Sequence, residues 1–304
     1  MTRGRLLRAV RDRVIAALGR GHVAGPTVED AVRVAEQEAT AGGTTTLGPW
    51  SASGDDPKIV LARQREAVSA IASAGLPASV SIKLPELHYD ERLLADVLSW
   101  AAAHRVGIHL DSLQADTAGA TFERLREVVA DHPDIGCTLP GRWARSVRDA
   151  EDVVGMGVRS VRVVKGQWED PGDPKRDPAD GMLEVVDALR GGGAAVGVAT
   201  HDEGLAARCL ERLVASDTDC RLEQLYGLPR LDVALFQRQL GVGHLLYVPY
   251  GEAYLPYALT QALRHPRILA WAARDLVGHP RRHQPSGLEA DRPPVGRLAL
   301  VTDR

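Results

Sequence analysis

Short apolar runs alternate along the chain with longer segments in which apolar positions recur every three or four residues. The short runs are rich in Val, Ile, Leu and Thr and indicate buried β-strands, whereas the longer segments have the periodicity of amphipathic helices. Thr27 and Asp30 form a capping-box-like start for the first helix. The expected strands cover 43–47, 79–84, 107–111, 135–139, 160–165, 195–200, 220–225 and 245–249. The clearest expected helices cover 29–41, 57–74, 91–103, 121–130 and 206–214.

Eight strands, each followed by a helix, over roughly 250 residues predict an α/β protein of the (β/α)8, TIM-like barrel class. A doubly wound sheet is the alternative, but such a sheet usually opens with a Gly-rich phosphate turn after its first strand. Here that turn reads Leu47-Gly-Pro-Trp-Ser-Ala-Ser-Gly54, which lacks the G-x-G-x-x-G spacing, so the barrel is favoured. We expect residues 27–277 to form the barrel.

Two segments fall outside the alternation. Residues 1–26 predict an N-terminal helical extension that packs beside or beneath the barrel. Residues 278–304 are rich in Pro, Gly and Arg, which predicts an irregular or disordered tail.

Composition narrows the functional classes. The 304 residues are 44% apolar and 25% charged, which is ordinary for a soluble globular protein. The net charge of −3 gives no bulk attraction to nucleic acid, and no apolar run is long enough for a transmembrane helix. The three cysteines lack metal-ligand spacing and form no even set, so we expect no metal site and a reduced, cytoplasmic location. The abundance of Ala, Arg and Gly over Lys favours a bacterial source.

Polar and aromatic side chains gather where the expected strands end. Function in TIM-like barrels collects at these carboxyl ends, so we expect the site there. Six strands end in such residues: Ser81-Ile-Lys83-Leu84, His109-Leu-Asp111, Arg162-Val-Val-Lys165-Gly166-Gln167-Trp168, Ala199-Thr200-His201-Asp202, Glu223-Gln224-Leu225-Tyr226-Gly227 and Tyr247-Val-Pro-Tyr250-Gly251.

In the same order, these segments resemble blocks of the proline dehydrogenase family. Residues 80–84 are similar to its Val-Ser-x-Lys-Leu, 161–166 to Val-Arg-Leu-Val-Lys-Gly, 199–201 to Ala-Thr-His and 225–227 to Leu-Tyr-Gly. Tyr247 and Tyr257 match the tyrosines of Tyr-x-Pro-x-Gly and Tyr-x-x-Arg-Arg at the spacing of short bacterial members. The resemblance implies a distorted barrel whose last helix lies across the mouth, with FAD as cofactor.

The resemblance implies a cofactor site along strands five to seven. Arg162, Lys165 and the backbone amides of Gly166 and Gln167 would provide positive potential for the FAD phosphates and the reduced ring. Thr200 offers a hydrogen bond, and the His201 ring could stack on the cofactor or bond to it. The structural alternatives are an ion-pair network in the barrel wall and a histidine bonded to local backbone. The full cofactor-binding set is Arg162, Lys165, Gly166, Gln167, Trp168, Thr200, His201 and Glu223.

The catalytic candidates are Lys83, Asp111 and Tyr247. Lys83 and Asp111 lie on neighbouring expected strands within reach of each other, and in the family the matching lysine faces the substrate carboxylate. A buried salt bridge is the structural alternative, because neither charge is expected to be buried unpaired. Tyr247 and Tyr257 would pack around the substrate, or serve only in helix–barrel packing. The substrate-binding set is Lys83, Tyr257, Thr260 and Gln261.

Three departures from the family pattern concern binding. Thr260 and Gln261 stand in place of the Arg-Arg pair that grips the proline carboxylate. Two charge-assisted bonds of ~1.5–3 kcal/mol each are lost, which would weaken binding of a free amino acid by about 10²-fold or more. The family glutamate after the first strand is missing as well, near Ser51 and Ala52, so both ends of one ion pair are lost together. Pro140 replaces a glutamine that bonds the flavin edge.

The leading hypothesis is therefore an FAD-dependent oxidoreductase that transfers hydride from an amine-type C–N substrate, other than ordinary free proline, to flavin N5. The substrate would be a small-molecule amine or amino-acid derivative from specialised metabolism. The electron acceptor is left open among quinone, oxygen and a partner protein. A true L-proline dehydrogenase that forms 1-pyrroline-5-carboxylate is the first alternative, with Arg264 one turn after Thr260 as a replacement cation. A non-catalytic barrel is the second.

Overall fold

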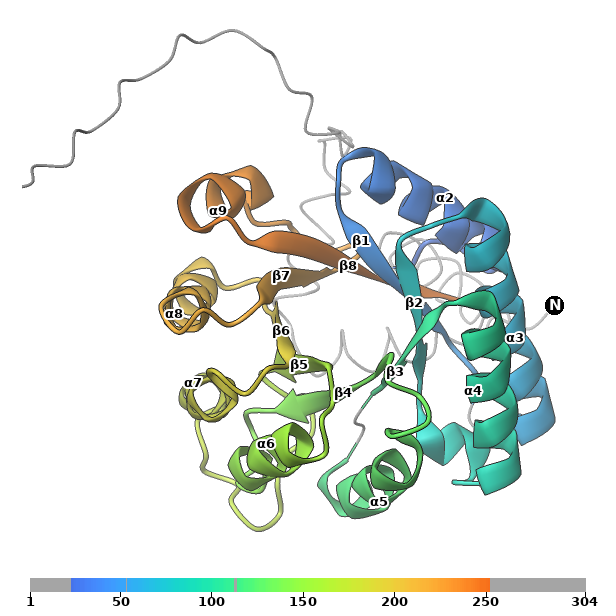
Figure 1. Cartoon of the computed structure of the whole chain (residues 1–304), viewed down its shortest axis with the longest axis horizontal. Helices are drawn as coiled ribbons and strands as arrows, with labels where there is room; N and C mark the ends of the chain where they lie inside the picture. Colours follow the sequence, from blue (N-terminus) through green and yellow to red (C-terminus); the bar gives the residue numbers. More distant parts are fainter. Residues whose placement is uncertain (1–22, 53, 112–113, 252–304) are drawn as a thin grey trace, which may run out of the picture.

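Eight parallel strands close into a barrel in chain order in the computed structural model, which describes residues 23–52, 54–111 and 114–251 (Figure 1). Every neighbouring pair is parallel, including β1 with β8, so the prediction of a (β/α)8 barrel is confirmed. The strands are β1 Thr44–Pro49, β2 Ala78–Ile82, β3 Gly107–Leu110, β4 Ile135–Pro140, β5 Ser160–Val164, β6 Ala195–Ala199, β7 Cys220–Leu225 and β8 Gly243–Tyr250.

Helices form the outer layer around the barrel (Figure 1). They are α2 Val28–Thr40, α3 Pro57–Ala74, α4 Glu91–His104, α5 Ala118–Val128, α6 Ser146–Gly155, α7 Pro178–Leu189, α8 Glu203–Val214 and α9 Val233–Leu240, with 3-10 turns η1 Leu84–Leu87 and η2 Ala115–Thr117. The capping box predicted at Thr27 and Asp30 opens α2. Aspartate side chains accept backbone N–H bonds at the starts of α3, α4, α7, α8 and α9, which satisfies donors that a helix leaves unpaired.

The strands separate an apolar outer layer from a polar interior. Residues that face the helices, such as Leu47, Val80 and Val163, are fully buried and apolar. Residues of the opposite parity, such as Arg162 and Glu223, bring charge into the barrel, where branched apolar side chains are usual. Glycine makes room for them: a Cβ at Gly197 would overlap the Glu223 carboxylate. The barrel interior is therefore built to hold polar groups.

Several expectations concern residues outside the described ranges. They are residues 1–22 of the extension expected over 1–26, the last helix across the mouth and the tail over 278–304. The described residues before α2 lie beside the end of β8, where Ala24 N–H donates to Pro249 O at 3.0 Å and Gly251 N–H donates to Gly25 O at 2.9 Å. Within residues 23–52, 54–111 and 114–251, no helix is long and apolar enough to span a membrane.

Candidate functional site

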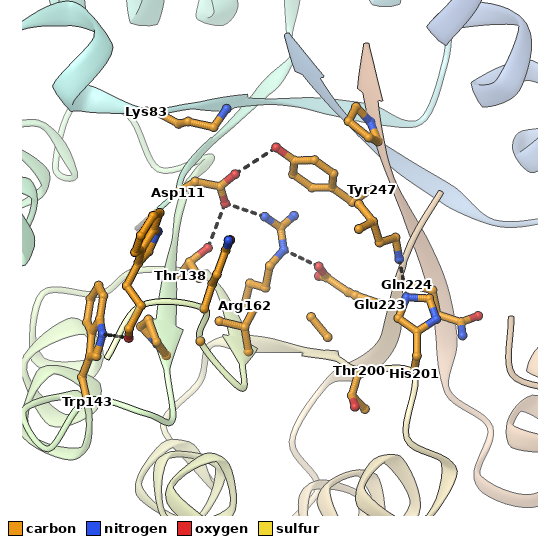
Figure 2. A pocket seen from close by; sticks show the side chains of 18 of the residues that line it. Lys83, Asp111, Thr138, Trp143, Arg162, Thr200, His201, Glu223, Gln224 and Tyr247 are labelled. Carbon is orange, nitrogen blue, oxygen red and sulfur yellow. Dashed lines mark hydrogen bonds and ion pairs between the residues drawn. The ribbon is translucent and has the colours of Figure 1, made fainter. Parts of the chain in front are cut away.

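A cavity of about 350 Å³ lies at the carboxyl ends of the strands, which is the expected place for a barrel site (Figure 2). This volume lies within the usual range for small-molecule sites. Its walls come from all eight strands or the loops that follow them. They are formed by Trp50, Lys83, Asp111, Thr138, Pro140, Trp143, Arg162, Val164, Gly166, Gln167, Trp168, Ala199, Thr200, His201, Glu223, Gln224, Leu225, Tyr247 and Pro249.

Arg162 joins two carboxylates at the floor of this mouth cavity. Its Nη1 lies 2.8 Å from Asp111 Oδ1 and its Nε lies 2.5 Å from Glu223 Oε2 (Figure 2). Burial alone would raise the pKa of Asp111 and of Glu223, but the Arg162 charge holds both pKa values at about 2. Both acids are therefore ionised at neutral pH, and their two negative charges face the positive charges of Arg162 and of Arg221, which also pairs with Glu223.

Asp111 is held by neutral donors as well. Ser81 Oγ donates to Asp111 Oδ2, Thr138 Oγ1 donates to Oδ1 at 3.0 Å, and the Tyr247 hydroxyl donates to Oδ2 at 3.1 Å. Burial and the Asp111 charge raise the pKa of Tyr247 well above its usual value, so this hydroxyl stays protonated. The arrangement fixes a carboxylate, surrounded by donors, at the wall of the cavity.

The buried salt bridge between Lys83 and Asp111, which was the structural alternative to a substrate contact, does not form among the described residues. Asp111 is taken by Arg162, and Lys83 Nζ has no hydrogen-bond partner among the described residues. The side chain is 5% exposed, and Nζ lies 4.8 Å from the centroid of the Trp50 ring. A buried ammonium without a hydrogen-bonded partner is costly, so Lys83 is the clearest candidate for contact with an anionic or electron-rich ligand.

Seven of the eight residues predicted to hold a cofactor line the cavity, and Lys165 does not. Lys165 is partly exposed, and its Nζ lies 3.1 Å from Asp202 Oδ2. His201 follows the structural alternative: its Nδ1 lies 2.8 Å from Pro229 O, and its Nε2 accepts the Leu225 N–H at 3.0 Å. These bonds require the neutral ring with the proton on Nδ1, so His201 offers its ring face to the cavity.

Aromatic side chains form much of the cavity wall. Trp143 is fully buried, and its Nε1 donates to Trp168 O at 3.0 Å, which ties the loop after β4 to the loop after β5. Trp50, Thr138 and Trp143 line the cavity but were not among the predicted site residues. For Thr138 the sequence carried a signal, because it has the same strand parity as Pro140 on β4. Tyr257, Thr260 and Gln261 lie outside the described residues.

Comparison with known proteins yields structural matches only. No protein-family model and no curated protein matches the sequence. Proline utilization A (PutA) from Bdellovibrio bacteriovorus aligns with a TM-score of 0.70 and 16% identity over 81% of this chain and 32% of that one. PutA from Corynebacterium freiburgense gives 0.65 and 17%, over 88% and 34%. A Bradyrhizobium japonicum PutA mutant gives 0.64 and 19%, over 89% and 35%. The chain thus spans about a third of these proteins, and the likeness shows a shared fold.

Proposed function

We propose that the protein is an FAD-dependent oxidoreductase, similar to proline dehydrogenase, that acts on a CH–NH donor other than ordinary free proline. The observation that carries the proposal is the mouth cavity, where a buried ammonium without a hydrogen-bonded partner and an ionised carboxylate share one aromatic chamber. The fold shared with the three PutA proteins supports the class of chemistry, because those proteins are named for proline utilization.

The residues present fit the ring portion of FAD. The walls offer aromatic faces for a planar group, and Gly166, with φ of +87°, turns the chain so that its backbone borders the cavity. The Thr200 hydroxyl accepts the Asp202 N–H at 3.1 Å, and its own hydrogen has no acceptor within the described part of the chain. The residues that would hold the cofactor are Arg162, Gly166, Gln167, Trp168, Thr200, His201 and Glu223, whereas Lys165 pairs with Asp202 and does not line the cavity. Pro140 offers no side-chain hydrogen bond there.

FAD, when bound, would supply the acceptor for a hydride that leaves a carbon bonded to nitrogen. The protein's part is to orient the donor and to stabilise the positive charge that develops on its nitrogen. Asp111 is suited to this second role, because it stays ionised and lines the cavity. A ligand bound against the tryptophan walls would displace water from the cavity, which would strengthen that electrostatic interaction.

Substrate choice is the finer part of the proposal. Lys83 offers one cation for an anionic group, whereas the family sequence pattern adds two arginines where Thr260 and Gln261 stand here. The loss of two charge-assisted contacts, about 1.5–3 kcal/mol each, disfavours a free carboxylate. A modified, esterified, carrier-bound or uncharged amine fits this set better.

The test is anaerobic bleaching of the FAD-loaded protein by a panel of cyclic and acyclic amines. The expected result is fast bleaching by an amine without a free carboxylate and slow bleaching by L-proline at equal concentration. Fast, saturable bleaching by L-proline would refute the substrate proposal and leave the flavin proposal intact. Protein that takes up no FAD would refute both and favour the non-catalytic barrel.

A strict L-proline dehydrogenase is the second candidate, and the same Lys83 ammonium favours it. In that case Lys83 and Arg264 would share the carboxylate between them. Loss of L-proline turnover in Arg264→Gln, with turnover kept in the nearby Arg267→Gln, would support this candidate; equal turnover in both variants would exclude the role of Arg264.

A further inference from the structure

A second cavity, of about 470 Å³, lies at the opposite end of the barrel, among the amino ends of the strands. Its walls include three arginines, Arg105, Arg159 and Arg221, and a single carboxylate, Asp134. Hydroxyl groups of Thr46, Ser79 and Ser160 border the same space. The charged side chains of this base cavity therefore carry a formal excess of positive charge.

The three guanidinium groups have N–H donors that are available to a ligand. Arg105 and Arg159 are exposed and have no ion-pair partner among the described residues. Arg221 is partly buried: its Nε donates to Glu223 Oε1 at 2.9 Å and its Nη2 donates to Ser160 Oγ at 3.1 Å. Its Nη1, which carries two hydrogens, has no partner in the described part of the chain. Planar donor groups of this kind match the oxygens of a phosphoryl group.

Arg221 is also the end of a charge ladder inside the barrel. Glu223 accepts from Arg221 through Oε1 and from Arg162 through Oε2, and Arg162 in turn binds Asp111. The ladder runs plus, minus, plus, minus from the base cavity to the mouth cavity. Its formal charges cancel, but its positive end borders the base cavity and its negative end borders the mouth. This polarity favours an anion at the base, even though the whole chain is slightly acidic.

We propose that the base cavity is a binding site for a divalent oxyanion, a phosphoryl group held by Arg105, Arg159 and the free Nη1 of Arg221. The site is independent of the proposed redox function, because it lies at the other end of the barrel and uses none of the residues assigned to that function. Free phosphate and the phosphate of a small ester would present the same oxygens to these arginines.

The test is calorimetric titration of the full chain with inorganic phosphate at constant ionic strength, with chloride as the reference anion. Arg105→Gln and Arg159→Gln each remove one exposed guanidinium, so each is expected to weaken phosphate binding by about tenfold. Arg208→Gln, an equal change of charge on α8 away from the cavity, is expected to bind phosphate like the wild type.

The Lys83→Met variant tests whether phosphate binds in the mouth cavity instead, because Lys83 lines that cavity and does not line the base cavity. Phosphate binding that survives this variant and falls in the two arginine variants supports the base site. Any one of four results would overturn the proposal. Phosphate binding could be lost in Lys83→Met, unchanged in both arginine variants, or weakened equally in Arg208→Gln, or the heats could equal those of chloride. Glycerol phosphate in place of inorganic phosphate then distinguishes the ligand source: tighter binding assigns an ester, and weaker binding assigns the free ion.

Discussion

Replacing Lys83 by methionine is expected to stabilise the folded protein while it removes a ligand contact. The variant keeps an unbranched apolar stem and deletes an ammonium that is 5% exposed and has no hydrogen-bonded partner among the described residues. Exchanging buried ionic groups for packed apolar ones often gains about 1–4 kcal/mol. The variant also loses the attraction between Nζ and the Trp50 ring at 4.8 Å, about 1–2 kcal/mol at a desolvated site.

The net expectation is a gain of about 1 kcal/mol in the free energy of unfolding, or roughly 2–4 °C in Tm. The assay is urea unfolding of the protein without ligand, followed by thermal unfolding with a carboxylate ligand. The wild type is expected to gain stability as the ligand concentration rises, and Lys83→Met is not.

Lys165→Met is the matched control, because it removes the same group from a partly exposed surface pair with Asp202. Such pairs contribute about 0–1 kcal/mol, so this variant is expected to change stability little. A loss of more than about 1 kcal/mol in Lys83→Met would contradict this expectation, because it would mean that the ammonium stabilises the fold in the absence of a ligand.

Four further changes test other parts of the site. Asp111→Asn leaves Arg162 with one of its two carboxylates, so we expect a loss of about 3 kcal/mol in urea unfolding and a large loss of flavin reduction; unchanged stability would contradict the buried ion pair. His109 is buried, and burial together with the Arg162 charge lowers its pKa to about 3, whereas the unfolded chain binds that proton near pH 6.5. Stability therefore falls as the pH falls, by about 2 kcal/mol between pH 7 and pH 5, and His109→Gln is expected to remove that part of the slope; equal slopes would contradict it. Gly197→Ala would place a Cβ against the Glu223 carboxylate, so we expect a loss of about 1–3 kcal/mol, and a neutral effect would show that the charge ladder can shift. The triple variant Thr260→Arg, Gln261→Arg and Ala52→Glu is expected to raise the affinity for L-proline by about 10²-fold, measured by bleaching. No gain would mean that the pocket differs elsewhere too.

The barrel could be predicted because each of its parts carries a local signal. Every expected strand overlaps an observed one, and the capping box at Thr27 is present, since apolar runs and caps depend on neighbouring residues. The positions of Lys83, Asp111 and Arg162 at the ends of expected strands predicted that all three line one cavity, because the parallel strands of a closed barrel have their carboxyl ends on the same side.

The pairing among those residues could not be predicted from the sequence. Asp111 had two possible cations, and only the inward direction of Arg162, with space provided by Gly197, decides between them. The backbone bonds of His201 depend on the loop after β7, whose path no periodicity describes. The outward turn of Lys165 to Asp202 depends on the same kind of tertiary detail.

The most direct test of the central claim is the visible spectrum of the purified full chain after incubation with FAD and removal of unbound cofactor. We predict that about one FAD is retained per chain, and less in Gly166→Val, where a side chain would meet Pro140 and Arg142. Colourless protein, or retention equal in the wild type and in Gly166→Val, would contradict the claim that this barrel mouth is a flavin site.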